Sequence, residues 1–248
     1  MPRPAPLTLL FLLSAPLAAV SATPPEPGHW SLGLAAVSQE SPYRGVAARR
    51  HLLPLLVVEH PRFAIQGPQA DLKLGRQAGM DLRLRLRWIP EGFEADDSAA
   101  LQGLAERRAS AWAGLATQGR AGPLRLSAEW LGDASGHSQG QRLRLGASTH
   151  LHAGAWQFGP RLAWTASDAR HARYYYGVRP AEARAGRPAF APGTQQGWEW
   201  GLRASLAAGR QGSWAIDLGQ QRGGLPSASP LISNGPRTQL GIGYLQRF

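Results

Sequence analysis

The stretch Asp81-Leu82-Arg83-Leu84-Arg85-Leu86-Arg87-Trp88 decides the fold, because apolar and charged side chains alternate along it without a break. In a β-strand, successive side chains point to opposite faces, so the leucines and Trp88 share one face and the arginines the other. A helix would scatter both sets around its circumference. The stretch therefore predicts a strand with one apolar and one strongly basic face.

The same two-residue period recurs along the rest of the chain. It is found in segments 124–130, 142–145, 156–164, 198–206 and 214–218. Clusters of Gly, Pro, Ser and Asp separate these segments, as turn residues do between strands. We expect strands near residues 30–38, 46–58, 61–67, 69–75, 80–89, 107–118, 122–131, 140–152, 155–168, 197–209, 212–222 and 237–248.

The first residues, 1–22, predict a cleaved secretory signal peptide. Arg3 supplies a positive charge, residues 7–20 form an almost unbroken apolar run, and Val20-Ser21-Ala22 offers small residues for cleavage. The run is too short to span a bilayer as a helix, and no later stretch is long and apolar enough to do so. The sequence contains no cysteine. We therefore expect residues 23–248 to form one exported domain without disulfides or a lipoprotein anchor.

The net charge of +11 comes almost entirely from arginine, since Lys73 is the only lysine. A basic chain first suggests nucleic-acid binding. Export argues against this, and so does the placement of the arginines at alternate strand positions rather than in one tract. We predict no nucleic-acid partner. The anionic partners outside the cytoplasm are lipopolysaccharide, murein and anionic solutes.

The connections between the expected strands alternate in length. Short links fall near 59–60, 76–79, 119–121, 153–154 and 210–211, and long ones at 39–45, 90–106, 132–139, 169–196 and 223–236. The link near 67–69 is short although it falls on the long side. Short periplasmic turns and long extracellular loops are typical of outer-membrane barrels, and only a closed sheet pairs every backbone group in hydrocarbon. We predict an all-β, transmembrane, antiparallel up-and-down barrel of about 12 strands, with about 10 as the alternative.

Aromatic residues fall at the ends of the expected strands, in register with the apolar face. Those at periplasmic ends are Trp30, Trp156, Trp214 and Phe248, and those at extracellular ends are Trp88, Trp130, Trp164, Trp198 and Trp200. This sorting predicts two membrane girdles in contact with outer-membrane lipid. Trp112 fits less well, because Leu115 has the opposite parity. The terminal Phe248 is the usual signal for the outer-membrane assembly machinery, although Gln246 stands at a position that is normally apolar.

The face opposite the apolar one predicts a basic lumen. Its arginines are Arg83, Arg85, Arg87, Arg125, Arg142, Arg144, Arg161 and Arg203, and acidic residues of the same parity are Asp81, Glu129, Glu199 and Asp217. Two interpretations stay open. The charges form a plug of salt bridges, or their positive surplus makes a weakly anion-preferring path.

Loop 169–196 carries a cluster of basic and aromatic residues, Arg173, Tyr174, Tyr175 and Tyr176. Such a cluster suits recognition of anionic sugar or phosphate groups. The alternative is a loop that packs on the barrel rim, which Gly177-Val178 and Pro180 favour because they indicate a fixed turn.

Residues for catalysis are sparse. Barrel hydrolases use a nucleophile, a base and an orienting acid in hydrogen-bond contact. The candidates here are His137 with Ser138, and His150 or His152 with Glu129. Neighbouring loop residues seldom make this geometry, and the two histidines lie at the opposite strand end from Glu129. We expect no catalytic residue, no metal site and no cofactor.

Several short stretches resemble the MipA/OmpV family, named for the MltA-interacting protein. They include Ser41-Pro42-Tyr43-Arg44-Gly45, Tyr175-Tyr176-Gly177-Val178 and Ser229-Pro230-Leu231. The family commonly ends in Tyr-Arg-Phe, where this chain has Gln246-Arg247-Phe248. The resemblance implies a non-enzymatic outer-membrane barrel and a role as a scaffold that brings murein hydrolase and synthase together. A narrow channel and a lipid-modifying barrel enzyme are the alternatives.

Overall fold

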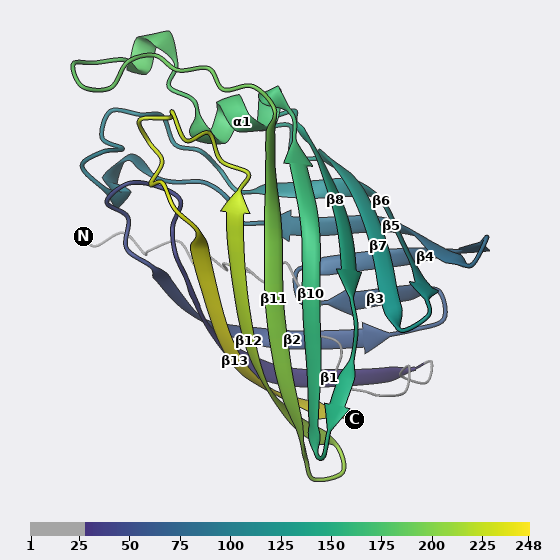
Figure 1. Cartoon of the computed structure of the whole chain (residues 1–248). Helices are drawn as coiled ribbons and strands as arrows, with labels where there is room; N and C mark the ends of the chain where they lie inside the picture. Colours follow the sequence, from purple (N-terminus) through teal and green to yellow (C-terminus); the bar gives the residue numbers. More distant parts are fainter. Residues whose placement is uncertain (1–27) are drawn as a thin grey trace, which may run out of the picture.

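The computed structural model describes residues 28–248, which form a closed antiparallel barrel with loops and a short helix gathered at one end (Figure 1). The strands are β1 (His29–Gln39), β2 (Arg49–Glu59), β3 (Phe63–Gln66), β4 (Gln69–Gln77), β5 (Met80–Ile89), β6 (Ser110–Ala121), β7 (Leu124–Asp133), β8 (Gln141–Ser148), β9 (Leu151–Ala153), β10 (Trp156–Ser167), β11 (Gln195–Ala208), β12 (Gly212–Gly223) and β13 (Arg237–Arg247). Helix α1 (Ala169–Tyr176) and the 3-10 turns η1 (Ala95–Asp97) and η2 (Pro180–Glu182) lie in the long loops. The predicted signal peptide lies outside the described residues.

The sheet closes because β1 pairs with β13 and β10 with β11. Strands β8 and β9 both pair with β10 and form one interrupted barrel position, so residues 28–248 make a barrel of twelve strands. The prediction of about twelve strands is confirmed. The interruption lies opposite Pro160, whose carbonyl accepts from Thr149 N at 3.2 Å but which has no N–H to return a bond.

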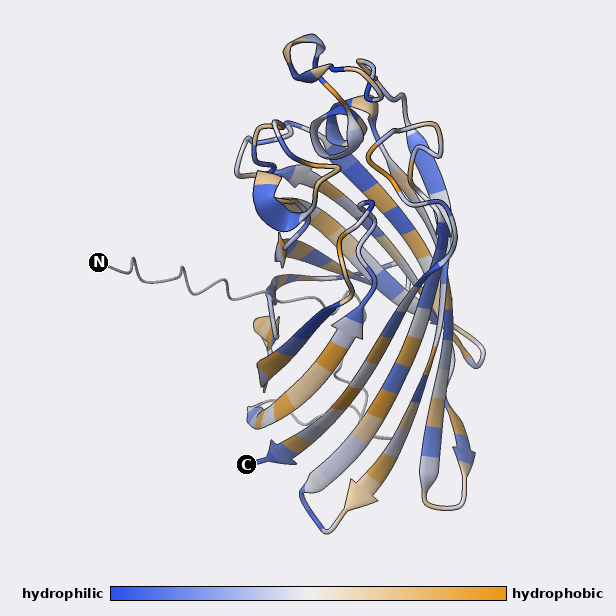
Figure 2. Ribbon diagram, turned by 90° about the vertical axis from the view of Figure 1, so that its left-hand side faces the viewer, coloured by the Kyte–Doolittle hydropathy of each residue, from blue (hydrophilic) through white to orange (hydrophobic). Residues whose placement is uncertain are grey.

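Apolar residues alternate with polar ones along the strands (Figure 2). On β5, the side chains of Leu84, Leu86 and Trp88 are exposed on the outer face. Those of Arg85 and Arg87 point inward and are largely buried. The period read from the sequence therefore sets an apolar exterior and a charged interior, as lipid outside and water inside require.

The β3–β4 hairpin is shorter than expected, because β3 has only four residues. Gly67 has a φ of 55°, a left-handed conformation that suits glycine, and with Pro68 it turns the chain into β4 early. Gly67 N donates to Leu56 O at 2.9 Å, which is the last backbone bond from this hairpin to β2. Pro54 stands two residues before Leu56 on β2, so its backbone points to the same side of the strand. Because β3 does not reach this far, the missing N–H of Pro54 breaks no hydrogen bond between strands.

The largest apolar core lies at the outer end of the barrel, mostly in the extracellular loops. Its buried members are Tyr43, Phe93, Leu101, Leu104, Trp112, Leu131, Ala172, Tyr175, Tyr176, Val178, Leu231 and Ile232. We call the packed loops 40–48, 90–109, 168–194 and 224–236 the lid. The loops also take residues 46–48 and 107–109, which the sequence pattern assigned to strands. Among residues 28–248, no helix is long and apolar enough to cross a membrane.

Candidate functional site

The lumen wall carries all eight predicted arginines on its inward face, held by β5, β7, β8, β10 and β11. Their neighbours in sequence face outward, as the exposed Leu84, Leu126, Leu145, Leu162 and Leu202 show. The arginines are not equivalent, because each group of them shares different carboxylates. Two ion-pair networks and the lid define the candidate site.

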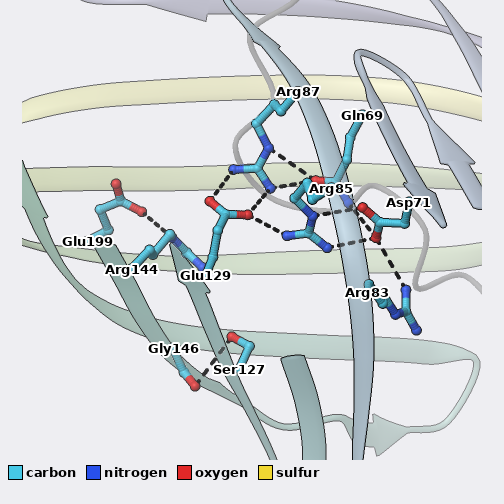
Figure 3. A network of polar contacts seen from close by, with 10 residues as sticks. All are labelled: Gln69, Asp71, Arg83, Arg85, Arg87, Ser127, Glu129, Arg144, Gly146 and Glu199. Carbon is cyan, nitrogen blue, oxygen red and sulfur yellow. Dashed lines mark hydrogen bonds and ion pairs between the residues drawn. The ribbon is translucent and has the colours of Figure 1, made fainter. Parts of the chain in front are cut away.

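The first network joins β4, β5 and β7 (Figure 3). Asp71 accepts from Arg85 Nε and Nη2, both at 2.8 Å, and from Arg83 Nη1 at 3.4 Å. Glu129 lies between two arginines and accepts from Arg85 Nη1 at 2.5 Å and Arg87 Nη1 at 3.0 Å. The Asp71 side chain is only 2% exposed, so this network is a fixed part of the wall rather than a set of mobile surface charges.

The second network lies on β8, β10, β11 and β12. Asp217 accepts from Arg161 Nη2 at 2.7 Å and from Arg203 Nε at 3.0 Å, and Glu199 accepts from Arg144 Nε at 3.1 Å. Three arginines therefore share two carboxylates. A Cβ at Gly201 would come within 2.4 Å of the Arg161 guanidinium carbon, so the glycine is what lets this side chain lie flat on the wall.

Sequence analysis found three of the four acids in these networks and missed Asp71. Asp81, which it assigned to the lumen set, pairs instead with the exposed Arg76 at 3.8 Å. Asp71 stands between Ala70 and Leu72 on β4, so its parity was visible in the sequence. That signal was weak, because β4 has no second inward acid to repeat it.

The lid rests on the outer end of the wall through Glu91. Its carboxylate accepts from Arg142 Nη1 at 2.7 Å and lies 2.8 Å from His171 Nε2 on α1. Burial acts to raise the pKa of Glu91, but Arg142 and His171 outweigh it and hold the pKa well below its ordinary value. Trp112 faces inward and packs edge-on against His171, which explains why it does not belong to a girdle.

A buried ion pair fixes the lid internally. Arg107 Nη2 donates to both oxygens of Glu182, at 3.0 and 2.8 Å, and the Arg107 side chain has no exposed surface. Arg107 also donates to Tyr174 O at 2.6 Å, and Glu182 accepts from Ala105 N at 3.1 Å. Burial raises the pKa of Glu182, yet these hydrogen bonds, Arg107 first, hold it below its ordinary value. Neither residue was predicted, because nothing in the sequence pairs residues so far apart.

The residues of the predicted recognition cluster lie in the lid and differ in their burial. Tyr175 and Tyr176 are buried, and burial raises the pKa of both phenols well above the ordinary value. Tyr174 is half-buried, and its hydroxyl accepts from Arg108 N at 3.0 Å. Of the four residues in the cluster, only Arg173 is exposed. The tyrosines therefore pack on the rim, and recognition by this cluster stays a prediction.

Neither candidate catalytic grouping is assembled. Ser138 Oγ donates to Asp133 at 2.7 Å, whereas His137 Nδ1 lies 3.3 Å from the hydroxyl of a different serine, Ser110. Glu129 is held by Arg85 and Arg87 rather than by a histidine. Among residues 28–248, no group of three His, Asp or Glu side chains is placed to hold a metal.

The girdle residues lie at the strand ends, and all but the half-buried Trp164 are exposed. At the periplasmic end, Trp30 and Phe248 stack with ring centroids 4.4 Å apart, and Phe248 N donates to Trp30 O at 2.9 Å. The final residue thus joins the first strand and completes the closure of the barrel.

Comparison with known proteins agrees with this architecture. A family model described as MltA-interacting protein MipA matches residues 32–248. The chain belongs to the MipA family. Among MipA-like proteins it is 29% identical over 158 residues to "Putative outer membrane protein YiaT" of Escherichia coli strain K12, a match that covers 62% of this chain and 63% of YiaT. The aligned part is thus less than two thirds of that relative.

One solved structure has the same fold, and a second is similar. The NanC porin aligns with a TM-score of 0.50 at 8% identity, covering 87% of this chain and 98% of the porin. The COG4313 outer membrane channel from Pseudomonas putida F1 aligns with a TM-score of 0.44 at 12% identity, covering 93% and 98%. The family and the barrel together place this MipA-family chain in the bacterial outer membrane.

Proposed function

We propose that this chain is a non-enzymatic outer-membrane scaffold that binds murein-processing enzymes at its periplasmic end. The description of the family, MltA-interacting, supports an interaction with a murein enzyme. The barrel supports the same role by its rigidity, because salt bridges tie β4, β5 and β7 together across the lumen wall. Murein enzymes are periplasmic, so the docking surface is the ring of periplasmic turns.

The observation that carries the proposal is the apolar packing of the lid at the outer end of the barrel. The lid and the outer ends of β6 and β7 together bury twelve apolar residues at that end, and the lid encloses the Arg107–Glu182 ion pair. Free passage of solutes would require this packing to open. A barrel that is closed in this way offers the periplasm a fixed surface rather than a path.

Binding in nanodiscs tests the proposal. The full barrel is immobilised, and a purified lytic transglycosylase and a murein synthase are passed over it, separately and together. Charge reversal in two periplasmic turns, Arg120→Glu with Arg210→Glu, is expected to weaken binding, since both side chains are exposed there. The matched reversal on the outer side, Arg170→Glu with Arg173→Glu, is expected to leave it unchanged. Absence of binding by the wild-type barrel to either enzyme contradicts the scaffold role.

A second function, a narrow channel with weak anion preference, is favoured by the charge of the lumen. In the two networks, six arginines share four carboxylates. Positive charge is therefore in surplus. A confined positive surplus attracts anions. Planar-bilayer recording decides this point, because no conductance or a cation preference removes the channel. A lipid-modifying activity has no assembled catalytic group to support it.

A further inference from the structure

A small pocket lies in the outer half of the lumen, beside the second ion-pair network. Its inward-facing lining comes from strands that are far apart in the sequence, and comprises Gln39, Arg144, Arg161, Glu199, Gly219, Gln221, Arg237 and Gln239. The pocket has a volume of about 70 Å³ and is partly open. That space holds several water molecules and therefore a ligand of a few heavy atoms.

The charge around this pocket is positive. Arg144 is compensated by Glu199, and Arg161 shares Asp217 with Arg203. Arg237 is different, since its Nη2 donates at 2.5 Å to the neutral amide oxygen of Gln221. No carboxylate of residues 28–248 forms a salt bridge with it. A guanidinium that faces a confined space with only an amide partner attracts an anionic oxygen.

The remaining wall is made of amides. Gln39, Gln221 and Gln239 face the same space from β1, β12 and β13. An amide both donates and accepts, so a row of them suits hydroxyl groups, which also do both. Arginines alone would suit any anion, whereas arginines with three glutamines suit an anion that also carries hydroxyls.

A glycine keeps the pocket open. A Cβ added at Gly219 would lie 3.4 Å from Arg161 Nη2 and 3.9 Å from the nearest backbone atom, so a larger side chain fits the fold but fills the space. This position therefore offers a way to block the pocket without changing any charge.

We propose that this pocket binds a small hydroxylated anion, a carboxylate or phosphate monoester with at least one hydroxyl group. Arg237 holds the anionic oxygens, Arg144 and Arg161 add positive potential, and the glutamines bind the hydroxyls. The site lies inside the barrel, away from the periplasmic turns. A test of ligand binding here is therefore independent of the test of the scaffold function.

Titration calorimetry on the folded full barrel in chloride-containing buffer tests the proposal. Glycerate and glycerol 3-phosphate are expected to bind, and their relative affinity tells whether a carboxylate or a phosphate is preferred. Propionate, which keeps the carboxylate but lacks hydroxyls, and glycerol, which lacks the charge, are expected to bind much more weakly. If neither hydroxylated anion binds, or if propionate binds as well as glycerate, the proposal is overturned.

Three variants locate the site. Arg237→Gln is expected to weaken binding by about tenfold or more, because one charge-assisted hydrogen bond is lost. Gly219→Val is expected to abolish binding with every charge retained, which keeps the test decisive if Arg237→Gln fails to fold. Arg222→Gln, at an exposed outward position on the same strand, is the control and is expected to bind as the wild type does. Unchanged affinity in folded Arg237→Gln or Gly219→Val contradicts the assignment.

Discussion

Replacing Glu182 by glutamine should open the lid. The substitution keeps the size of the side chain but removes the only carboxylate among residues 28–248 that pairs with Arg107, whose side chain is fully buried. Breaking a buried ion pair costs about 3–5 kcal/mol. Arg107 keeps its bonds to the carbonyls of Tyr174 and Ala105, so the low end applies. At about 1.4 kcal/mol per factor of ten, about 3 kcal/mol raises the open population on the order of 100-fold.

Limited proteolysis measures this population. Trypsin cleaves the lid loop 168–194 after its arginines only when the lid opens. The cleavage rate then follows the population of the open state. Glu106→Gln is the matched control, because Glu106 pairs at 3.4 Å with Arg108 in an exposed contact that is worth less than about 1 kcal/mol. The control should cleave less than about fivefold faster than the wild type. Equal cleavage rates for folded Glu182→Gln and wild type would show that the pair does not hold the lid.

Three further outcomes are expected. Asp71→Asn leaves Arg85 with Glu129 as its only carboxylate partner in the described part of the chain, and should lower the temperature at which heat-modifiable gel mobility is lost, by an amount that matches roughly 3 kcal/mol. Trp112→Ala removes a fully buried ring and should destabilise the protein by about 3–5 kcal/mol, whereas Trp198→Ala, at an exposed position, should cost much less; equal losses in denaturant titration would contradict the assigned burial. Glu91 has a lowered pKa, so its contribution is present above the unfolded value of about 4.3 and is lost as pH falls through the folded value. Pepsin should therefore cut the lid loops faster below about pH 4, and a flat pH profile would contradict this.

The barrel could be predicted from the sequence because its determinant is local. In β5, the alternation of leucine and arginine fixes which side chains face lipid and which face the lumen, whatever the neighbouring strands are. The same parity put Trp112 outside the girdle pattern, and the structure shows the reason, since that ring is buried beneath the lid. The alternation of short and long connections added the strand count, because every pair of strands returns the chain to the periplasmic side.

The strand ends were less predictable, because they depend on single residues that break a ladder. Pro160 interrupts the partner strand across from it, and Gly67 ends the β3–β4 hairpin early. Both residues are visible in the sequence, but their effect depends on which neighbour they face.

The sequence by itself determined the class of the fold and the two faces of each strand, since both follow from a two-residue period. Only the tertiary structure decided which charges meet. Arg85 and Glu129 are brought together by the register of β5, β6 and β7, and Arg107 and Glu182 by loops that share no period. A shift of one residue in that register would turn Glu129 outward, so its partners are a property of the closed barrel and not of the local pattern.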